Sequence, residues 1–331
     1  MSEVAERAGV GLASVSRVLS GHPDVSDTMR ARVLKAVDEL GYTPNLLAQG
    51  LRRHETSSVG FMLSDIANPL LAGIVQGAES ILRRQSYSML LTDSERDVEL
   101  DVSHLRVLRQ RRVDGLIVMP ASEADPRTLD LLDDSGTPLV VIDRDLPKSI
   151  MAGYVLSDHA AGTTEAARHL YDLGHRRVGL LLGPDVHPNR VREQVLSELV
   201  AGWGPEAVLS VRPNRAGAEA AGAALGELLD GDRGPTAVFL GSNQMLPGVL
   251  RVVHGRGLEL GRDLSLVSVD DTPLTELHVP EVSVIDRDAG EIGRTAAELL
   301  LRLVRGEGDP ETIVLPTHYL PRASSGSARV E

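Results

Sequence analysis

Three polar side chains in the second half of the chain have the chemistry of a small-molecule binding site: Arg192, Asn243 and Asp270. A forked guanidinium, an amide and a carboxylate can together bracket a hydroxylated or anionic ligand. Asn243 and Asp270 each follow a short apolar run of the kind that forms buried strands. In doubly wound sheets, ligands bind beyond the carboxyl ends of the strands. We therefore predict that these three residues line one ligand cleft.

Other residues near the ends of predicted strands join this cleft as candidates. They are Ile66, Asn68, Asp143 and Ser157. Simpler roles stay open, because Asp143 and Asp270 would also serve as caps of helices or turns. Arg190 is an alternative to Arg192. An aromatic side chain often stacks on a bound sugar ring, and with 2 % aromatic residues the candidates are Trp203 and Phe239, both with structural roles as alternatives.

A second group of residues has the chemistry of DNA recognition. Arg17 lies one turn into a predicted helix, where its guanidinium can donate two hydrogen bonds to guanine O6 and N7. Leu12 and Ala13 occupy outward positions at the start of that helix and can contact a thymine methyl group. Ser14 and Ser16 are better placed for phosphate contacts. The alternative is an exposed arginine on a solvated helix.

Residues 1–43 have the pattern of three short helices with a tight turn between the first two. Gly9 suits that turn, Ser26 suits the N-cap of the third helix, and Gly41 suits its end. The apolar side chains at helical spacing are Val4, Ala5, Ala8, Val15, Val18, Leu19, Met29, Val33, Val37 and Leu40. This arrangement is typical of a helix-turn-helix, with the second helix from about Leu12 to Leu19 as the recognition helix.

From Val59 onward, short apolar runs alternate with helical stretches. The predicted strands are Val59–Leu63, Tyr87–Leu91, Val113–Met119, Leu139–Ile142, Tyr154–Leu156, Val178–Leu182, Ala237–Leu240, Leu264–Val269 and Val282–Ile285. The predicted helices are Leu70–Arg84, Val98–Arg111, Ala160–Leu173, Ala216–Leu229, Met245–Arg256 and Ala289–Val304. Such alternation predicts parallel sheets covered by helices, in two doubly wound lobes. The tail from Pro321 is predicted to fray.

Composition and charge limit the function further. The chain has no cysteine, which excludes disulfides and thiolate metal sites. No apolar run approaches the roughly 18 residues of a membrane span, and residues 1–20 lack the apolar core of a signal peptide, so we predict a soluble cytoplasmic protein. The net charge is −13, yet residues 1–55 hold seven basic and seven acidic residues. Nonspecific attraction to DNA should therefore be modest, and base contacts should supply much of the selectivity.

Catalytic patterns are missing from the sequence. It has no phosphate-binding P-loop, no nucleophile elbow and no histidine pair at metal-ligand spacing. We therefore predict a binding protein without enzymatic activity, cofactor or metal.

Ordered motifs run along almost the whole chain. They include E-V-A-E-R-A-G-V at 3–10, S-V-S-R-V-L-S at 14–20, L-G-Y-T-P-N-L-L-A at 40–48, R-R-V-D-G-L-I-V at 111–118, P-L-V-V-I-D-R at 138–144 and L-G-H-R-R-V at 173–178. With these motifs the chain resembles the LacI/GalR (lactose-repressor) family of transcription regulators. The resemblance implies a homodimeric transcription regulator, expected to be a repressor. Such a regulator binds double-stranded operator DNA and responds to a small effector such as a sugar.

The resemblance also implies a domain organisation. Residues 1–43 form the helix-turn-helix, 44–57 a hinge helix or linker, and 58–331 a periplasmic-binding-protein-like core for effector binding and dimerisation. Lobe 1 takes in about 58–157 and 287–316, and lobe 2 about 158–286 and 317–327. The further DNA contacts implied are Tyr42, Asn45, Gln49 and Leu51. Leu51 matches the apolar wedge that such hinges insert into the minor groove; the alternative is a plain linker with Leu51 packed on the core.

Departures from the family pattern lie in the expected cleft. Leu70 and Leu71 stand where two phenylalanines are usual, Gln244 where an aspartate is usual, and Val195 where a glycine is usual. Leu71 remains a predicted cleft residue, but effector identity does not carry over, and a lost effector response stays open. The alternative function is a two-lobed solute-binding receptor without a DNA role, which would have no use for residues 2–40.

Overall fold

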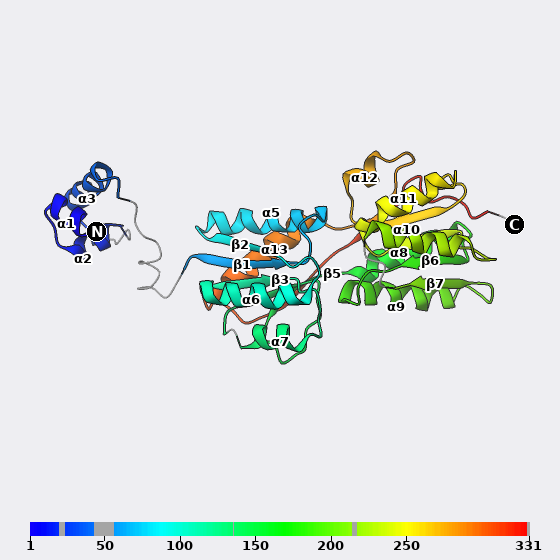
Figure 1. Ribbon diagram of the computed structural model, residues 1–331, viewed down its shortest axis with the longest axis horizontal. Helices are drawn as coiled ribbons and strands as arrows, with labels where there is room; N and C mark the ends of the chain where they lie inside the picture. Colours follow the sequence, from blue (N-terminus) through cyan, green and yellow to red (C-terminus); the bar gives the residue numbers. More distant parts are fainter. Residues whose placement is uncertain (20–23, 43–55, 135, 214–216, 330–331) are drawn as a thin grey trace. The chain divides into compact units, whose positions relative to one another are not determined.

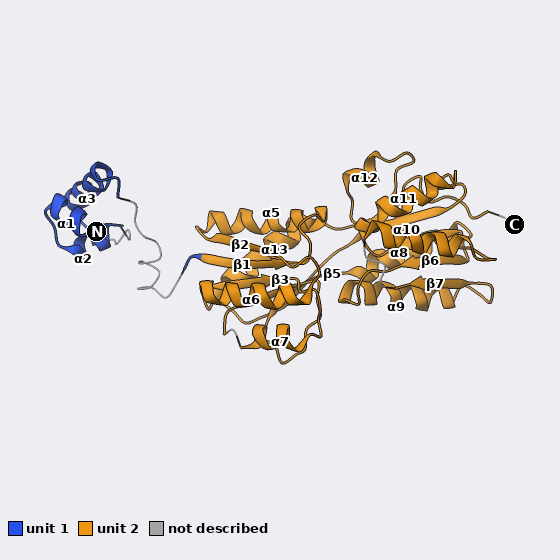
Figure 2. Ribbon diagram, in the orientation of Figure 1, with its two compact units in different colours: residues 1–57 blue, residues 58–331 orange. Residues whose placement is uncertain are grey.

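The computed structural model describes residues 1–19, 24–42, 56–134, 136–213 and 217–329. The chain divides into two compact units, Met1–Ser57 and Ser58–Glu331 (Figure 2). The described part of the first unit forms three helices, α1 (Ser2–Ala8), α2 (Leu12–Leu19) and α3 (Asp27–Glu39).

The three helices of the first unit surround a small apolar core. Its buried members are Val4, Ala5, Ala8, Val15, Val18, Val25, Val33 and Ala36. Ser26 caps α3, and its Oγ accepts a hydrogen bond from the amide of Met29 at 3.4 Å. Arg32 ties α3 to the end of α1 by donating to the carbonyl oxygens of Ala8 (2.5 Å) and Gly9 (3.0 Å). Gly9 is left-handed (φ 63°), and a Cβ there would meet the Arg32 guanidinium at 2.8 Å.

One residue of the predicted apolar stripe does not belong to this core. Leu40 is 43 % exposed in this unit. It follows Glu39, the last residue of α3, as the C-cap, so the helical periodicity no longer directs its side chain inward.

The first lobe of the larger unit (Figure 1) is built on a parallel sheet. This sheet has six strands in the order β11-β5-β4-β3-β1-β2. Its strands are β1 (Ser58–Leu63), β2 (Ser88–Asp93), β3 (Gly115–Val118), β4 (Leu139–Ile142), β5 (Gly153–Ser157) and β11 (Thr312–Leu315). One face packs against α5 (Pro69–Arg84) and α13 (Ala289–Val304). The other face packs against α6 (Val98–Arg111) and α7 (Pro126–Asp133).

The second lobe repeats this plan with the strand order β12-β10-β9-β8-β6-β7. Its strands are β6 (Arg177–Leu181), β7 (Val208–Arg212), β8 (Ala237–Leu240), β9 (Ser265–Val269), β10 (Ser283–Asp286) and β12 (His318–Leu320), the last antiparallel to β10. Its helices are α8 (His159–Asp172), α9 (His187–Ala201), α10 (Ala218–Leu229), η1 (Asn243–Met245), α11 (Leu246–Gly255) and α12 (Pro273–Leu277). Helices α10 and α11 cover one face, and α8 and α9 the other.

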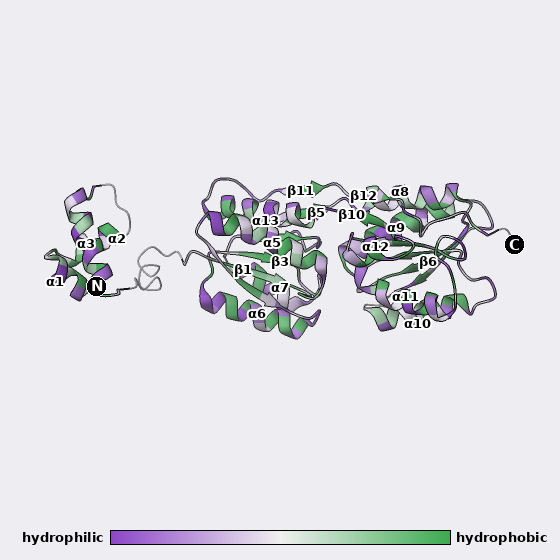
Figure 3. Ribbon diagram, turned by 90° about the horizontal axis from the view of Figure 1, so that it is seen from above, coloured by the Kyte–Doolittle hydropathy of each residue, from purple (hydrophilic) through white to green (hydrophobic). Residues whose placement is uncertain are grey.

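The interior of each lobe lies on both faces of its sheet, under the helices that cover them. Every residue of β3, β4 and β8 is buried, and Figure 3 shows hydrophobic residues concentrated along the inner strands. Close helix packing extends this core. A Cβ at Gly293 of α13 would overlap the carbonyl oxygen of Ile74 in α5, so only glycine permits this approach.

The described chain passes between the lobes at three places: after β5, after β10 and between β11 and β12. The connecting residues include Asp158, Arg287 and Thr317. Thr317 donates its hydroxyl to the carbonyl of Asp158 at 2.7 Å, which holds two of these connections side by side. The lobes therefore meet at the carboxyl ends of β4, β5, β9 and β10.

The predicted fold class is confirmed, and the nine predicted strands and six predicted helices are present within one or two residues at most ends. The elements not predicted are β7, β11, β12, α7, α9, α12 and the short helix η1. β7 and β11 are edge strands with few buried residues, so their apolar signal is weak. No helix in the described part of the chain is long and apolar enough to cross a membrane.

The predicted fraying of the C-terminal tail is wrong up to residue 329. Ser324 is fully buried, donates to the carbonyl of Leu266 at 2.7 Å and accepts from the amide of Ser283 at 2.8 Å. The tail follows β12 along the second lobe, and these bonds fix it despite its polar sequence.

Candidate functional site

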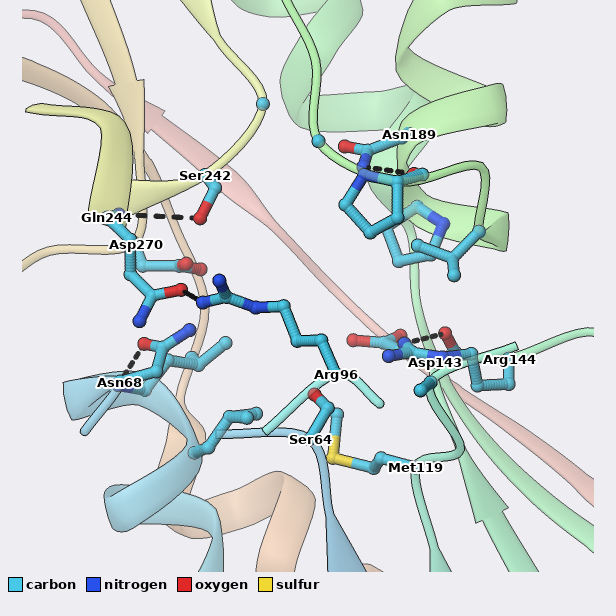
Figure 4. Close-up of a pocket in the computed structure, with 18 of the residues that line it drawn as sticks. Ser64, Asn68, Arg96, Met119, Asp143, Arg144, Asn189, Ser242, Gln244 and Asp270 are labelled. Atoms are coloured by element: carbon cyan, nitrogen blue, oxygen red, sulfur yellow. Dashed lines mark hydrogen bonds between the residues drawn. The ribbon is translucent and has the colours of Figure 1, made fainter. Parts of the chain in front are cut away.

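A cavity of about 110 Å³ lies where the two lobes meet, at the carboxyl ends of their strands (Figure 4). Five of the predicted effector residues line it: Asn68, Leu71, Asp143, Arg192 and Asp270. They come from both lobes and from positions up to about 200 residues apart, yet the two sheets bring them to one place.

Three other predicted effector residues are not among the described residues that line the cavity. Ile66 is 44 % exposed, and its amide donates to Asp93 Oδ2 at 3.0 Å. Ser157 is buried behind Asp143 and donates its hydroxyl to Oδ2 of that carboxylate at 3.2 Å. Asn243 is buried and hydrogen-bonds to Asp270 and Asn68, which line the cavity. Ser157 and Asn243 therefore position lining groups.

The Asn243 amide joins the lobes. Its Nδ2 donates to Asp270 Oδ2 at 2.9 Å and to Asn68 Oδ1 at 3.0 Å. Asn68 is also the N-cap of α5 and accepts from the amide of Leu70 at 3.0 Å. Asn68 therefore both caps α5 and lines the cavity.

Arg287 is the central residue that the sequence analysis missed. It lies in the connection after β10, and its Nε donates to Asp270 Oδ1 at 2.8 Å. Its Nη1 donates to Asp143 Oδ2 and, at 3.1 Å, to Ser157 Oγ. Although burial alone would lower the pKa of Arg287, Asp270 and Asp143 raise it above its ordinary value. A basic residue directly after β10, the last of the strands predicted from the sequence, was the signal available in the sequence.

The two aspartates held by Arg287 share an unusual backbone conformation. Asp143 follows β4 with φ 46°, and Asp270 follows β9 with φ 62°. Left-handed backbone is rare for residues other than glycine and gathers at functional sites. Burial raises the pKa of Asp143, but His159 and Arg287 lower it more, so that the pKa lies well below its ordinary value.

His159 links Asp143 to Arg192. The Arg192 Nη2 lies 3.1 Å from His159 Nδ1. Because a guanidinium only donates, Nδ1 accepts, and the proton sits on Nε2, which donates to Asp143 Oδ1 at 3.2 Å. Burial lowers the pKa of His159 to about 4, so the ring is neutral at pH 7. His159 was not predicted as a site residue.

Arg190, the alternative to Arg192, lies at the rim. Its Nη2 donates to Glu123 Oε2 of the first lobe at 2.5 Å, and its side chain is 43 % exposed. The amide of His187 donates to the other Glu123 oxygen at 2.9 Å. Arg190 therefore closes one side of the cleft, whereas Arg192 faces the cavity.

A second contact between the lobes is made by residues that line the cavity. Arg96 extends across the cavity towards Gln244 of the second lobe and donates to its Oε1 (Figure 4). Asp65 accepts from Gln244 Nε2 at 2.8 Å and from Arg96 Nη2 at 2.6 Å. Gln244 thus bonds to both ends of a first-lobe ion pair, and the lobes are closed on each other.

The aromatic candidates for sugar stacking have structural roles. Phe239 is fully buried in β8, and Trp203 packs on Tyr171 with ring centroids 5.4 Å apart. Neither is among the described residues that line the cavity.

In the first unit, α2 presents the predicted DNA-contacting residues on its outer face. Leu12, Ala13 and Arg17 are exposed, and Ser14 and Ser16 are half-buried. The remaining predicted contact within the described residues, Tyr42, is half-buried against the helix core. Asn45, Gln49 and Leu51 lie outside the described residues.

Comparisons with known proteins cover both units. Residues 1–45 match the family described as bacterial regulatory proteins, lacI family, and residues 167–325 match the periplasmic binding protein-like domain. The ribose operon repressor of Haemophilus influenzae is 30 % identical, with 97 % of each chain covered. The transcriptional regulator CelR of Thermobifida fusca is 32 % identical, with 97 % of this chain and 96 % of the relative covered.

Solved structures agree with these relatives. The Lac repressor dimer bound to operator and the anti-inducer ONPF matches with a TM-score of 0.86 and 26 % identity over 98 % of both chains. The CelR–cellobiose complex matches with a TM-score of 0.73 and 31 % identity, also over 98 % of both chains.

A helix-turn-helix unit in one chain with a two-lobed ligand-binding core defines a DNA-binding transcription regulator. The chain belongs to the LacI family of bacterial regulatory proteins. The predicted family and the class of function are thereby confirmed, and the protein is a regulator rather than an enzyme.

Proposed function

We propose that this protein, as a homodimer, binds a palindromic operator through α2 and represses transcription under the control of a small hydroxylated metabolite. The observation that carries the effector site is the meeting of five predicted residues from both lobes in one cavity. The CelR and Enterococcus faecium relatives, solved with cellobiose and ribose, support a sugar-like effector. The place of action is the cytoplasm, where bacterial operators lie.

The two lobes supply the means of control. Two contacts between the lobes, Arg190 with Glu123 and Arg96 with Gln244, hold the lobes closed, and a ligand that rearranges these contacts would change how the lobes meet. We propose residues 44–57 as the hinge that transmits this change, with Leu51 as its minor-groove wedge. Tyr42, Asn45 and Gln49 are proposed as further DNA contacts.

Arg17→Ala tests the recognition helix. Losing a bidentate contact to guanine should weaken operator binding by about 1–3 kcal/mol and relax selectivity at one base pair. Mobility shifts with the operator and with single-base variants measure both effects. Lys35→Ala, which removes an exposed cation of α3, is the control and should keep the base preference. Equal weakening on all sequences would instead make Arg17 a phosphate contact.

Asp270→Asn tests the effector site. Asparagine keeps an acceptor for Arg287 but loses the carboxylate that faces the cavity, so operator binding without effector should persist while the response to effector is lost. The measurement is operator affinity with and without a metabolite that raises the melting temperature of the parent. Asp271→Asn is the matched control, because Asp271 bonds to Arg322 at 2.8 Å and is not among the described lining residues. An unchanged response in Asp270→Asn would remove this residue from the site.

A further inference from the structure

The cavity holds more positive charge than its own residues neutralise. Its charged lining residues are four arginines and two aspartates, namely Arg96, Arg144, Arg192, Arg287, Asp143 and Asp270. The neutral state of His159 adds no charge, so the lining carries a net charge of +2. Adding Asp65, which pairs with Arg96, leaves a net charge of +1, and the nearby Glu123 carboxylate is itself paired with Arg190.

Both aspartates are already engaged. Arg287 pairs with Asp270 through Nε and with Asp143 through Nη1. Arg96 pairs with Asp65 at 2.6 Å. The two remaining guanidinium groups, on Arg144 and Arg192, therefore face the cavity without a carboxylate of their own.

Arg192 is the stronger case. It is 3 % exposed, and its Nη atoms donate to the neutral acceptors Gly241 O (3.1 Å), Asn189 Oδ1 (3.5 Å) and His159 Nδ1 (3.1 Å). Its Nε is buried and has no hydrogen-bond partner among the described residues. Burial and Arg287 lower the pKa of Arg192 to about 10. A buried cation in this state lacks the anion that normally accompanies it.

Arg144 repeats the pattern on the first lobe. It is 8 % exposed, with Nε donating to the carbonyl of Pro120 at 2.8 Å and Nη1 to the carbonyl of Asp143 at 2.9 Å. Within the described ranges, neither Arg144 nor Arg192 forms an ion pair with a carboxylate, although Glu123, Asp143 and Asp101 lie close enough to Arg144 to offset part of the effect of burial on its pKa. Burial lowers the pKa of Arg144 below its ordinary value.

The ends of two helices add to the positive electrostatic potential in the cavity. The first residues of α5, including Leu70 and Leu71, and of α9, including Pro188 and Asn189, line the cavity. Both helices are at least four turns long, and their N-terminal ends carry partial positive charge. These dipoles favour an anion in the cavity that the two arginines also line.

We infer that the effector is a compact anion, a hydroxylated metabolite whose carboxylate or phosphate group pairs with Arg192 and Arg144. This inference rests on the proposed effector site and adds the charge of its ligand. For ligand hydroxyl groups, the Asp270 carboxylate remains an acceptor, and the Asn68 amide nitrogen is a donor because Asn68 Oδ1 already accepts two hydrogen bonds. The volume of about 110 Å³ is below the roughly 300–1,000 Å³ of sites for drug-sized ligands, which suits a small acid.

Inorganic phosphate tests the proposed anion-binding site at Arg192 and Arg144 without knowledge of the effector. At constant ionic strength, replacing chloride by phosphate should raise the melting temperature of the full-length parent by about 2–4 °C once phosphate exceeds its Kd roughly ten-fold. Arg192→Gln should abolish the rise, and Arg144→Gln should reduce it. Arg256→Gln, at an exposed arginine paired with Asp230, is the control and should keep it.

Two results would overturn the inference: no rise in the parent, or an equal rise in Arg192→Gln. Arg192→Gln also shows whether the residue is merely structural, because loss of an unpaired buried cation should leave the melting temperature in chloride unchanged or higher. If the melting temperature of Arg192→Gln in chloride falls by many degrees, Arg192→Lys is used as the test variant in its place. Lysine keeps the positive charge, so Arg192→Lys should retain part of the rise caused by phosphate.

Matched pairs of sugars identify the acid group. Titration calorimetry with glucose and gluconate, and with ribose and ribose 5-phosphate, should give at least ten-fold tighter binding for one acid than for its neutral partner. The pair that shows the preference distinguishes carboxylate from phosphate. If a neutral sugar binds as tightly as its acid and alters operator affinity, the inference fails while the proposed function stands. If operator affinity responds to no small molecule, the proposed effector control itself fails.

Discussion

Asp143→Ala should lower the free energy of unfolding of the two-lobed unit by about 3–5 kcal/mol, the cost of breaking a buried ion pair by removing one partner. The Asp143 side chain is 2 % exposed and Arg287 9 %, so water cannot replace the lost carboxylate. The Ser157 amide, which donates to Asp143 at 2.8 Å, and His159 would also lose their acceptor. Urea unfolding followed by circular dichroism and by the single tryptophan, Trp203, measures the loss.

Two further variants isolate the role of the charge. Asp143→Asn keeps an acceptor for Ser157 and should lose less than alanine does. Asp230→Ala removes an exposed partner of an arginine, Arg256, and should change stability little, because solvent screens that pair. Similar losses in Asp143→Ala and Asp230→Ala would mean that the buried network adds nothing beyond a surface ion pair.

His159 should make the protein markedly less stable in mild acid. Its pKa falls from 6.5 in the unfolded chain to about 4 in the fold, because burial disfavours the charged ring. Between these values the unfolded chain binds a proton that the folded chain does not, so stability falls as the pH falls from 6.5 towards 4. At 1.36 kcal/mol per pH unit, the loss attributable to His159 is about 3 kcal/mol.

The comparison with His159→Gln isolates this contribution. Glutamine can accept from Arg192 and donate to Asp143 without titrating. Unfolding free energies of parent and variant, measured from pH 7 to 4, should therefore diverge by about 3 kcal/mol as the pH falls. His318→Gln, at an exposed residue of β12, should follow the parent. Parallel curves for the parent and His159→Gln would show that His159 is not held neutral.

Much of this protein follows from its sequence because the signals are local. Helix α2 has the predicted bounds Leu12–Leu19, since Val15 and Val18 fall on one face at helical spacing. Apolar runs alternating with helical stretches predict two parallel sheets, and the carboxyl ends of the strands then locate Asp143 and Asp270. A strand end is a short-range property, so these two residues could be identified without a structure.

The choice between Arg190 and Arg192 needed the tertiary structure. Both lie on α9, a helix whose apolar pattern was too weak to predict. Two residues along a helix differ by about 200° in direction, so one guanidinium turns to the rim and Glu123, and the other into the cavity. The sequence analysis favours Arg192 and keeps Arg190 as an alternative, and the orientation of α9 shows where each of the two guanidinium groups points.

The charge balance of the site was also decided only by the fold. Arg287 is 144 residues from Asp143 in sequence, and it neutralises that carboxylate because the connection after β10 passes between the lobes. Composition counts every charge of the chain alike and gives a net charge of −13. Which charges are paired depends on distances of a few ångströms between distant segments, and for that reason a strongly acidic chain can enclose a cavity lined with excess positive charge.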